Sequence, residues 1–109
     1  MLDDDLQMIY ATRGISLKEI LHINEVAFLL SDALLLIPLF RKASIPVLGS
    51  HVYIQVGSEI QPAYAMWHCN QLLNEDYASY VARSLDHTEA YIKKYPVNRN
   101  ELFVFGYEK

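Results

Sequence analysis

Histidine and cysteine are the residues best suited to catalysis or metal binding, and their arrangement here favours neither. Neighbouring side chains on a strand point to opposite faces, so His68 and Cys69 cannot form a thiolate–imidazole pair without a bend in the chain. No C-x-x-C, H-x-x-x-H or H-E-x-x-H spacing occurs. We therefore expect no metal, no cofactor and no catalytic cysteine. Cys69 is predicted to be a small buried apolar residue, and the histidines are predicted to lie at the surface: His22, His51, His68 and His87.

The four glycines are spaced for turns and strands and form no phosphate-binding loop. Gly14 is predicted to end a helix as its C′ residue, and Gly57 is predicted to form a tight turn. Gly49 and Gly106 fall within expected strands, where glycine marks a bulge or a close approach of two backbones. The pattern gives no support to a nucleotide-binding function.

Paired carboxylates can act as general acid and base, but the one adjacent pair outside the N-terminal run has a structural explanation. Glu75 and Asp76 stand where a long helix is expected to begin. Acidic side chains at that end of a helix complement its dipole. We therefore predict that the protein is not an enzyme.

A long stretch without basic residues is the most informative feature of the chain. From Ala43 to Ala82 there is no Lys or Arg, and Glu59, Glu75 and Asp76 give the stretch three negative charges. Exposed aromatic residues bury a large area at low entropic cost when a partner binds, and acidic residues steer association with a basic partner. The stretch therefore predicts a protein-interaction face, although its aromatic residues would also suit a core. The candidate contact residues are Tyr53, Glu59, Tyr64, Trp67, Glu75 and Asp76, with Tyr53 and Trp67 as anchors.

Length and composition limit the remaining classes of function. The 109 residues suffice for one domain, 1–109, and a single cysteine excludes an internal disulfide and fits a reducing, cytoplasmic compartment. A net charge of −4 argues against nucleic acid as the partner. The acidic residues 3–5 are unlike a signal peptide. The most apolar segment, 26–40, is shorter than the roughly 20 residues of a membrane span, so no membrane partner is expected.

The elements that would position these residues begin with three helical or extended segments. Apolar periodicity predicts a helix over 3–13, and Ser16 with Glu19 forms a capping box for a short helical turn that reaches about residue 22. Residues 25–29 are predicted to form a short strand. The capping signal Ser31-Asp32 predicts a further helix over 32–43, kinked by Pro38.

The second half of the chain reads as a hairpin, a long helix and a last strand. Strands are predicted over 45–56 and 59–68, a helix over 74–95 that Pro96 ends, and an interior strand over 102–107. This order predicts an α+β fold with a small, mainly antiparallel sheet packed with helices. One core is expected to bury Leu48, Tyr77, Val81, Leu85, Ile92 and Val104.

Short segments spread over residues 14–105 carry a family resemblance. They are Gly14-Ile15-Ser16-Leu17, Glu25-Val26-Ala27-Phe28, Asp32-Ala33-Leu34, Ile45-Pro46-Val47-Leu48-Gly49, Val52-Tyr53, Trp67, Tyr80 with Ser84, Ala90-Tyr91-Ile92 with Tyr95, and Leu102-Phe103-Val104-Phe105. In order and spacing they resemble the bacterial Immunity protein 40 family, the small antidotes of polymorphic toxin systems. The family's strand motif reads Gly-Gly-Asp-Val-Tyr, where this chain has an acid replaced by His51.

The resemblance implies a non-catalytic protein that binds a cognate toxin domain and neutralises it stoichiometrically. The alternative from another class is a small enzyme or ligand-binding domain with a pocket near His51, Tyr53 and Trp67. A homodimeric scaffold is a third alternative. A gene directly downstream of a large secreted toxin would favour the first, and a buried polar pocket converging on His51 would favour the second.

Overall fold

The structure is a computed structural model that describes residues 4–23, 25–95 and 100–107. Its elements are α1 (Asp4–Arg13), β1 (Ile15–Ser16), α2 (Lys18–Leu21), β2 (Val26–Ala27), α3 (Leu30–Ala43), β3 (Val47–Val56), β4 (Glu59–His68), α4 (Tyr77–Lys94) and β5 (Asn100–Tyr107). This order confirms the predicted α+β fold and adds one short strand, β1, that the sequence pattern had not indicated.

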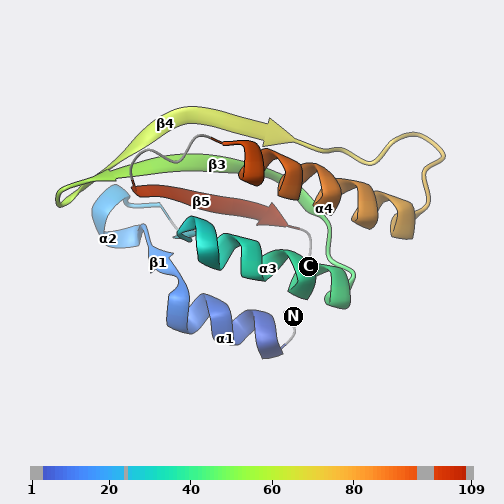
Figure 1. The fold of residues 1–109 in the computed structure, drawn as a ribbon, viewed down its shortest axis with the longest axis horizontal. Helices are drawn as coiled ribbons and strands as arrows, with labels where there is room; N and C mark the ends of the chain where they lie inside the picture. The colour runs from blue at the N-terminus through green and yellow to red at the C-terminus, as the bar shows by residue number, and fades with distance from the viewer. Residues whose placement is uncertain (1–3, 24, 96–99, 108–109) are drawn as a thin grey trace.

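The main sheet has three antiparallel strands in the order β4-β3-β5 (Figure 1). The hairpin between β3 and β4 lies where it was predicted, and Gly57 has the positive φ of +63° that its turn requires. The prediction that the last strand lies in the interior of the sheet is wrong, because β3 is the central strand. Phe28 still bonds to Phe103 through both backbone groups, so the small β1–β2 sheet is joined to the outer edge of β5.

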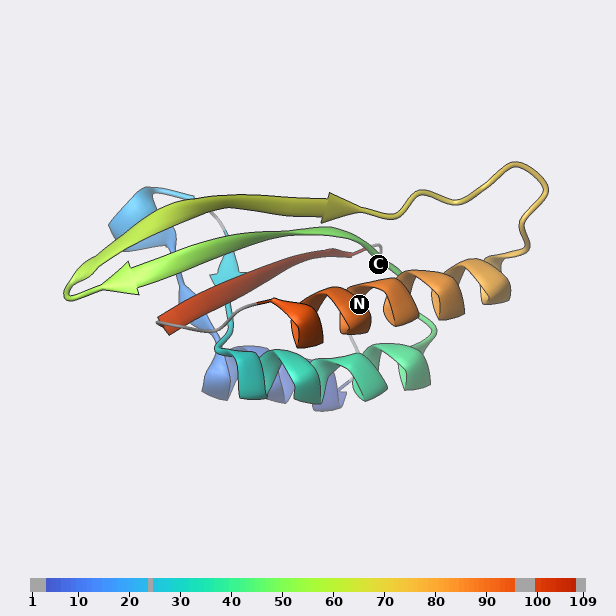
Figure 2. The ribbon, with the colours of Figure 1, turned by 45° about the horizontal axis from the view of Figure 1, so that its top comes forward.

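Helices α3 and α4 cover one face of the sheet, and α1 packs against α3, as Figure 2 shows. The larger apolar cluster fills this side and includes Val81, Leu85 and Ile92, which confirms part of the predicted core. A second, smaller cluster lies on the other face, where Leu17 and Ala27 cover one end of the sheet. Val104 is buried there, in a core separate from that of α4.

Two residues of the predicted core are exposed instead. Leu48 is 36% exposed because the strand pairing shifts between Val47 and Gly49, and this irregularity breaks the alternation of faces. Val47 takes the buried position. Tyr77 is 46% exposed at the first residue of α4.

Helix boundaries differ from their predicted positions for local reasons. α3 begins at Leu30, so Ser31-Asp32 is not its cap, and the Asp32 carboxylate accepts a 3.2 Å bond from Arg13 instead. The helix continues through Pro38 to Ala43. The prediction of Ser16 as N-cap of α2 is also wrong, since Leu17 holds that position, although the Ser16 hydroxyl accepts from the Lys18 amide at 3.3 Å.

Gly14 ends α1 by a close contact rather than by a left-handed C′ conformation. Its φ is not positive, and an added Cβ would overlap Val26 and lie 2.5 Å from the Tyr10 carbonyl oxygen. The predicted helix over 74–95 begins only at Tyr77, and Pro96 lies outside the described residues. In the part of the chain that the structure describes, no helix has the length and apolar character needed to cross a membrane.

Candidate functional site

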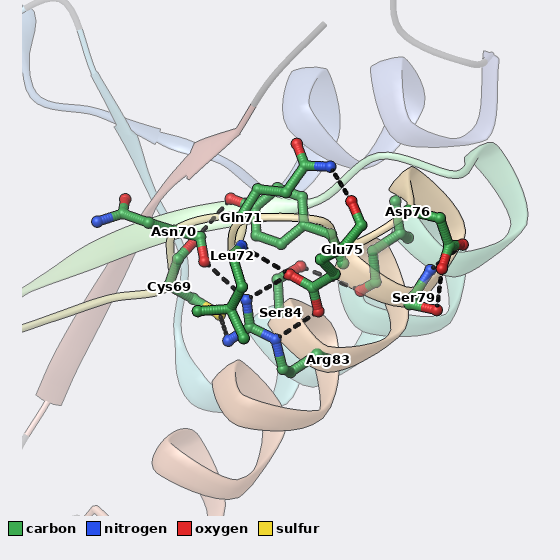
Figure 3. A network of polar contacts seen from close by, with 11 residues as sticks. Cys69, Asn70, Gln71, Leu72, Glu75, Asp76, Ser79, Arg83 and Ser84 are labelled. Atoms are coloured by element: carbon green, nitrogen blue, oxygen red, sulfur yellow. Dashed lines mark hydrogen bonds and ion pairs between the residues drawn. The ribbon is translucent and has the colours of Figure 1, made fainter.

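Arg83 of α4 holds the loop of residues 69–76 against the helix; we call this segment the braced loop (Figure 3). Its guanidinium donates to both oxygens of the Glu75 carboxylate, at 2.8 Å each. It also donates to the Asn70 carbonyl at 2.7 Å and to the Cys69 sulfur at 3.2 Å. One side chain thus fixes both ends of the loop.

Glu75 completes this network from the other side. Its carboxylate accepts the Leu72 amide at 2.9 Å, and its carbonyl accepts the Gln71 side-chain amide at 2.7 Å. The hydrogen bonds from Arg83 and then from Leu72 lower the pKa of Glu75 to about 2. Glu75 is therefore a candidate contact residue whose carboxylate already serves the fold.

Asp76 has a comparable local role at the start of α4. As the N-cap residue, its carboxylate accepts the Ser79 hydroxyl at 2.6 Å and the Ser79 amide at 3.1 Å. These bonds lower its pKa. Its side chain is nevertheless exposed, as is that of Glu59, whose carboxylate accepts only a 3.1 Å bond from Gln61 among the contacts of the described residues. Both acids remain accessible to a partner.

The two aromatic anchor candidates lie within the protein rather than on its surface. Trp67 is 6% exposed, stacks on Tyr91 with ring centroids 4.1 Å apart, and donates its indole N–H to Thr88 at 3.3 Å. Tyr53 is buried in the second cluster, and its hydroxyl donates to Glu25 at 3.5 Å. Burial first, and then the Glu25 carboxylate, raises the pKa of Tyr53.

The six candidates therefore do not converge on one surface. Tyr64 lies in β4, and its side chain is outside the described residues. The stretch from 43 to 82 does expose several large apolar side chains in the folded chain. They are Leu48, Val56, Met66, Leu72, Leu73 and Tyr77.

The sheet face opposite α3 and α4 is open at the end not covered by the second cluster. A depression of about 220 Å³ lies there, and its lining includes Leu48, His51, Met66 and His68. A second depression of about 320 Å³ runs along β5 and includes Tyr10 and Tyr107. The two share Glu25 and Gly106, and we call them together the outer groove.

Pairing register explains why this face is hollow. Gly49 and Gly106 are cross-strand partners in β3 and β5, so neither strand places a side chain on the sheet at that point. As predicted, Gly49 lies at a close backbone approach, since an added Cβ would lie 2.5 Å from the Trp67 carbonyl oxygen. Two positions further along β3, on the same face of the sheet, His51 lies opposite Met66 of β4.

The histidines and Cys69 confirm their predicted placement. All four histidines are exposed, and Cys69 is buried. Among residues 4–23, 25–95 and 100–107, no group of three or more His, Cys, Asp or Glu side chains is placed to hold a metal ion.

Most of the chain matches one known protein family. The model of Immunity protein 40 matches residues 16–106, which is most of the chain. The protein therefore belongs to the Immunity protein 40 family, as the sequence resemblance predicted. Neither the curated proteins nor the solved structures gave a match.

Glu25 and Gly106 are the groove residues that sequence reasoning did not select. Glu25 opens one of the segments that carry the family resemblance, but a single acid before a short strand gives no functional signal. Gly106 was predicted to mark a bulge or a close backbone approach, and its pair with Gly49 does border the shift in strand pairing between Val47 and Gly49. The backbone approach itself is not close, because an added Cβ would meet the Gly49 carbonyl oxygen at an ordinary 3.7 Å.

Proposed function

We propose that the protein is a bacterial, cytoplasmic antidote that binds the toxin domain of its own polymorphic toxin system and neutralises it stoichiometrically, without catalysis. The observation that carries this proposal is membership of the Immunity protein 40 family over residues 16–106. The acidic surface supports it, because negative charge favours encounter with a basic toxin domain.

The proposed docking surface is drawn from the stretch between residues 43 and 82, which has no Lys or Arg. Tyr53 and Trp67 are buried, so we assign direct contact to exposed residues of the same stretch. Glu59 and Asp76 would supply acidic contacts, and Met66 and Leu73 are exposed apolar residues on β4 and the braced loop. Glu75 would act indirectly, by fixing the shape of the braced loop.

The alternative of a small-molecule pocket near His51 receives less support from the geometry. The depression beside His51 is an open hollow of about 220 Å³, below the roughly 300–1,000 Å³ of typical ligand clefts. Trp67 contributes to its lining, but Tyr53 does not. A shallow open hollow suits a protruding protein segment better than an enclosed small ligand.

The test is a titration of the toxin domain encoded beside this gene with the purified chain. We expect a complex by size-exclusion chromatography and loss of toxin activity that becomes complete near one equivalent. Absence of a complex, or toxin inactivation by far less than one equivalent of the chain, would contradict stoichiometric binding.

A further inference from the structure

We propose that the outer groove receives a Lys or Arg side chain from a loop of the toxin, and that Glu25 is its carboxylate partner. This inference rests on the proposed function and specifies the chemistry of the contact. Four features of the groove carry it: the Glu25 carboxylate without an ion pair, the lack of Lys and Arg in the lining that the structure describes, the hydroxyl of Tyr10, and the glycine at position 106.

Glu25 is held in place by its backbone while its carboxylate remains largely unused. Its carbonyl accepts the Leu17 amide at 3.0 Å, and its amide donates to the Ile23 carbonyl at 2.8 Å. Within the described residues, the carboxylate has no ion pair and accepts only the long 3.5 Å bond from Tyr53. Other acids are paired within the fold: Asp5 with Lys42, Asp32 with Arg13, Glu75 with Arg83, and Asp86 and Glu89 with Arg41.

Among the described residues, the basic side chains that line the groove around Glu25 are two histidines, His51 and His68. Its lining, as far as the described chain extends, contains no Lys and no Arg. A cation from a partner would therefore meet the carboxylate without displacing an internal ion pair. Leu48 and Met66 form apolar walls against which the aliphatic part of a Lys or Arg side chain can pack.

The far end of the groove carries the side chains of Tyr10 and Tyr107. The Tyr10 hydroxyl is buried close to Tyr107, and burial first, and then Tyr107, raises the pKa of Tyr10. Phenol oxygens accept hydrogen bonds, so a guanidinium of a docked loop that reaches this end would meet acceptors there.

Gly106 leaves the groove open although the fold does not require glycine there. Its φ is not positive, and an added Cβ would meet only the Gly49 carbonyl oxygen, at an ordinary 3.7 Å. Gly106 lines both depressions and is exposed. A large side chain at this position would start from a Cβ that the surrounding atoms accommodate and would take up space in the groove.

The experiment compares toxin affinity for three full-length variants by calorimetry: Glu25→Gln, Gly106→Phe and, as the control, Asp4→Asn. Glu25→Gln should weaken binding by roughly 10- to 100-fold, because it leaves the toxin's cation unpaired in the groove. Gly106→Phe should weaken binding at least as much by occupying the space. Asp4→Asn removes an exposed acid of α1 outside the groove and should change affinity by less than about threefold.

The outcomes separate this inference from the proposed function. If the wild-type chain binds the toxin domain and Glu25→Gln and Gly106→Phe bind equally well, the groove inference is wrong and the function stands. If the wild-type chain does not bind, the proposed function fails first. The other possible occupant of the groove is a second copy of this chain, and sedimentation of the free variants tests it. If Gly106→Phe reduces self-association and leaves toxin affinity unchanged, the groove binds a second copy and the inference is wrong. Thermal melts of each variant exclude loss of folding as the cause.

Discussion

The braced loop and the outer groove each contain a glutamate, and the fold uses the two in opposite ways. Glu75 is bonded on both oxygens by Arg83 and accepts a backbone amide as well. Glu25 stands in an open groove with one long bond from Tyr53. A carboxylate whose hydrogen bonds are satisfied internally gains little from a partner, whereas a partly buried one without a cation gains more.

The same contrast holds for the neighbours of the two acids. In the braced loop, Arg83 donates hydrogen bonds to the Cys69 sulfur and the Asn70 carbonyl. These polar groups therefore stabilise the conformation of the loop. In the outer groove, the Glu25 carboxylate has no ion pair among the described residues, and Gly106 leaves space. Negative charge in a sequence therefore indicates a binding residue only after the internal partners of each acid are known.

The largest expected difference is between substitutions on the two faces of β4, measured as the change in the free energy of unfolding. Trp67→Ala should lower the free energy of unfolding by about 3–5 kcal/mol, because it removes a buried ring stacked on Tyr91. Met66→Ala, its neighbour on the groove face and 50% exposed, should stay within about 0.5 kcal/mol of wild type. Urea unfolding measures both. Similar losses for the two variants would show that the groove face is also part of the core.

Replacing two glycines by alanine should give smaller changes in stability, of opposite sign or size at the two positions. Gly14→Ala should cost about 1–3 kcal/mol, because the new methyl overlaps Val26 and the Tyr10 carbonyl. Gly106→Ala should be neutral or stabilise by up to about 1 kcal/mol, since its backbone accepts any residue and the unfolded chain loses freedom. Thermal melts of the two proteins check this. A loss for Gly106→Ala as large as that for Gly14→Ala would mean that the fold itself requires this glycine.

The smallest expected effect comes from replacing Glu75 in the braced loop, and it is a change in how the free energy of unfolding depends on pH. The pKa of Glu75 is lowered to about 2 in the folded protein, so its contribution is present above the ordinary glutamate pKa of about 4.3. That contribution is lost as the pH falls toward 2. Unfolding free energies between pH 6 and about 2 should therefore decline less steeply in Glu75→Gln than in wild type.

Arg83 provides the check on this pH effect, because it supplies the bonds that lower the pKa of Glu75. Arg83→Gln should flatten the same part of the curve, and the double variant should add nothing further. Additive effects of the two substitutions would refute the assignment of Arg83 and Glu75 to one network.

The sequence predicted the elements better than the contacts between them. The hairpin between 45 and 68 and the apolar face of α4 follow from local periodicity, so their predicted positions lie within a few residues of those in the structure. Leu48 was misplaced because a shift in strand pairing depends on the partner strand, which a single strand's pattern does not contain. The central position of β3 likewise depends on pairing between distant segments.

The candidate site was predicted less well, for a related reason. The stretch without Lys or Arg was read as a surface, but its two largest anchor candidates, Trp67 and Tyr53, are packed inside. Glu25 and Gly106 meet in the groove because Phe28 pairs with Phe103, which brings together residues that are 81 positions apart in the chain. Spacing along the chain cannot show such a site, whereas the family was visible because it depends on the order of many short segments.

Hydrogen exchange of the chain, free and in complex with its toxin domain, tests the central claim most directly. The account predicts new amide protection at residues 48–51, 66–68 and 104–107, which form the outer groove, and at Glu25. Groove amides that exchange at the same rate in the free chain and in the complex would contradict the account.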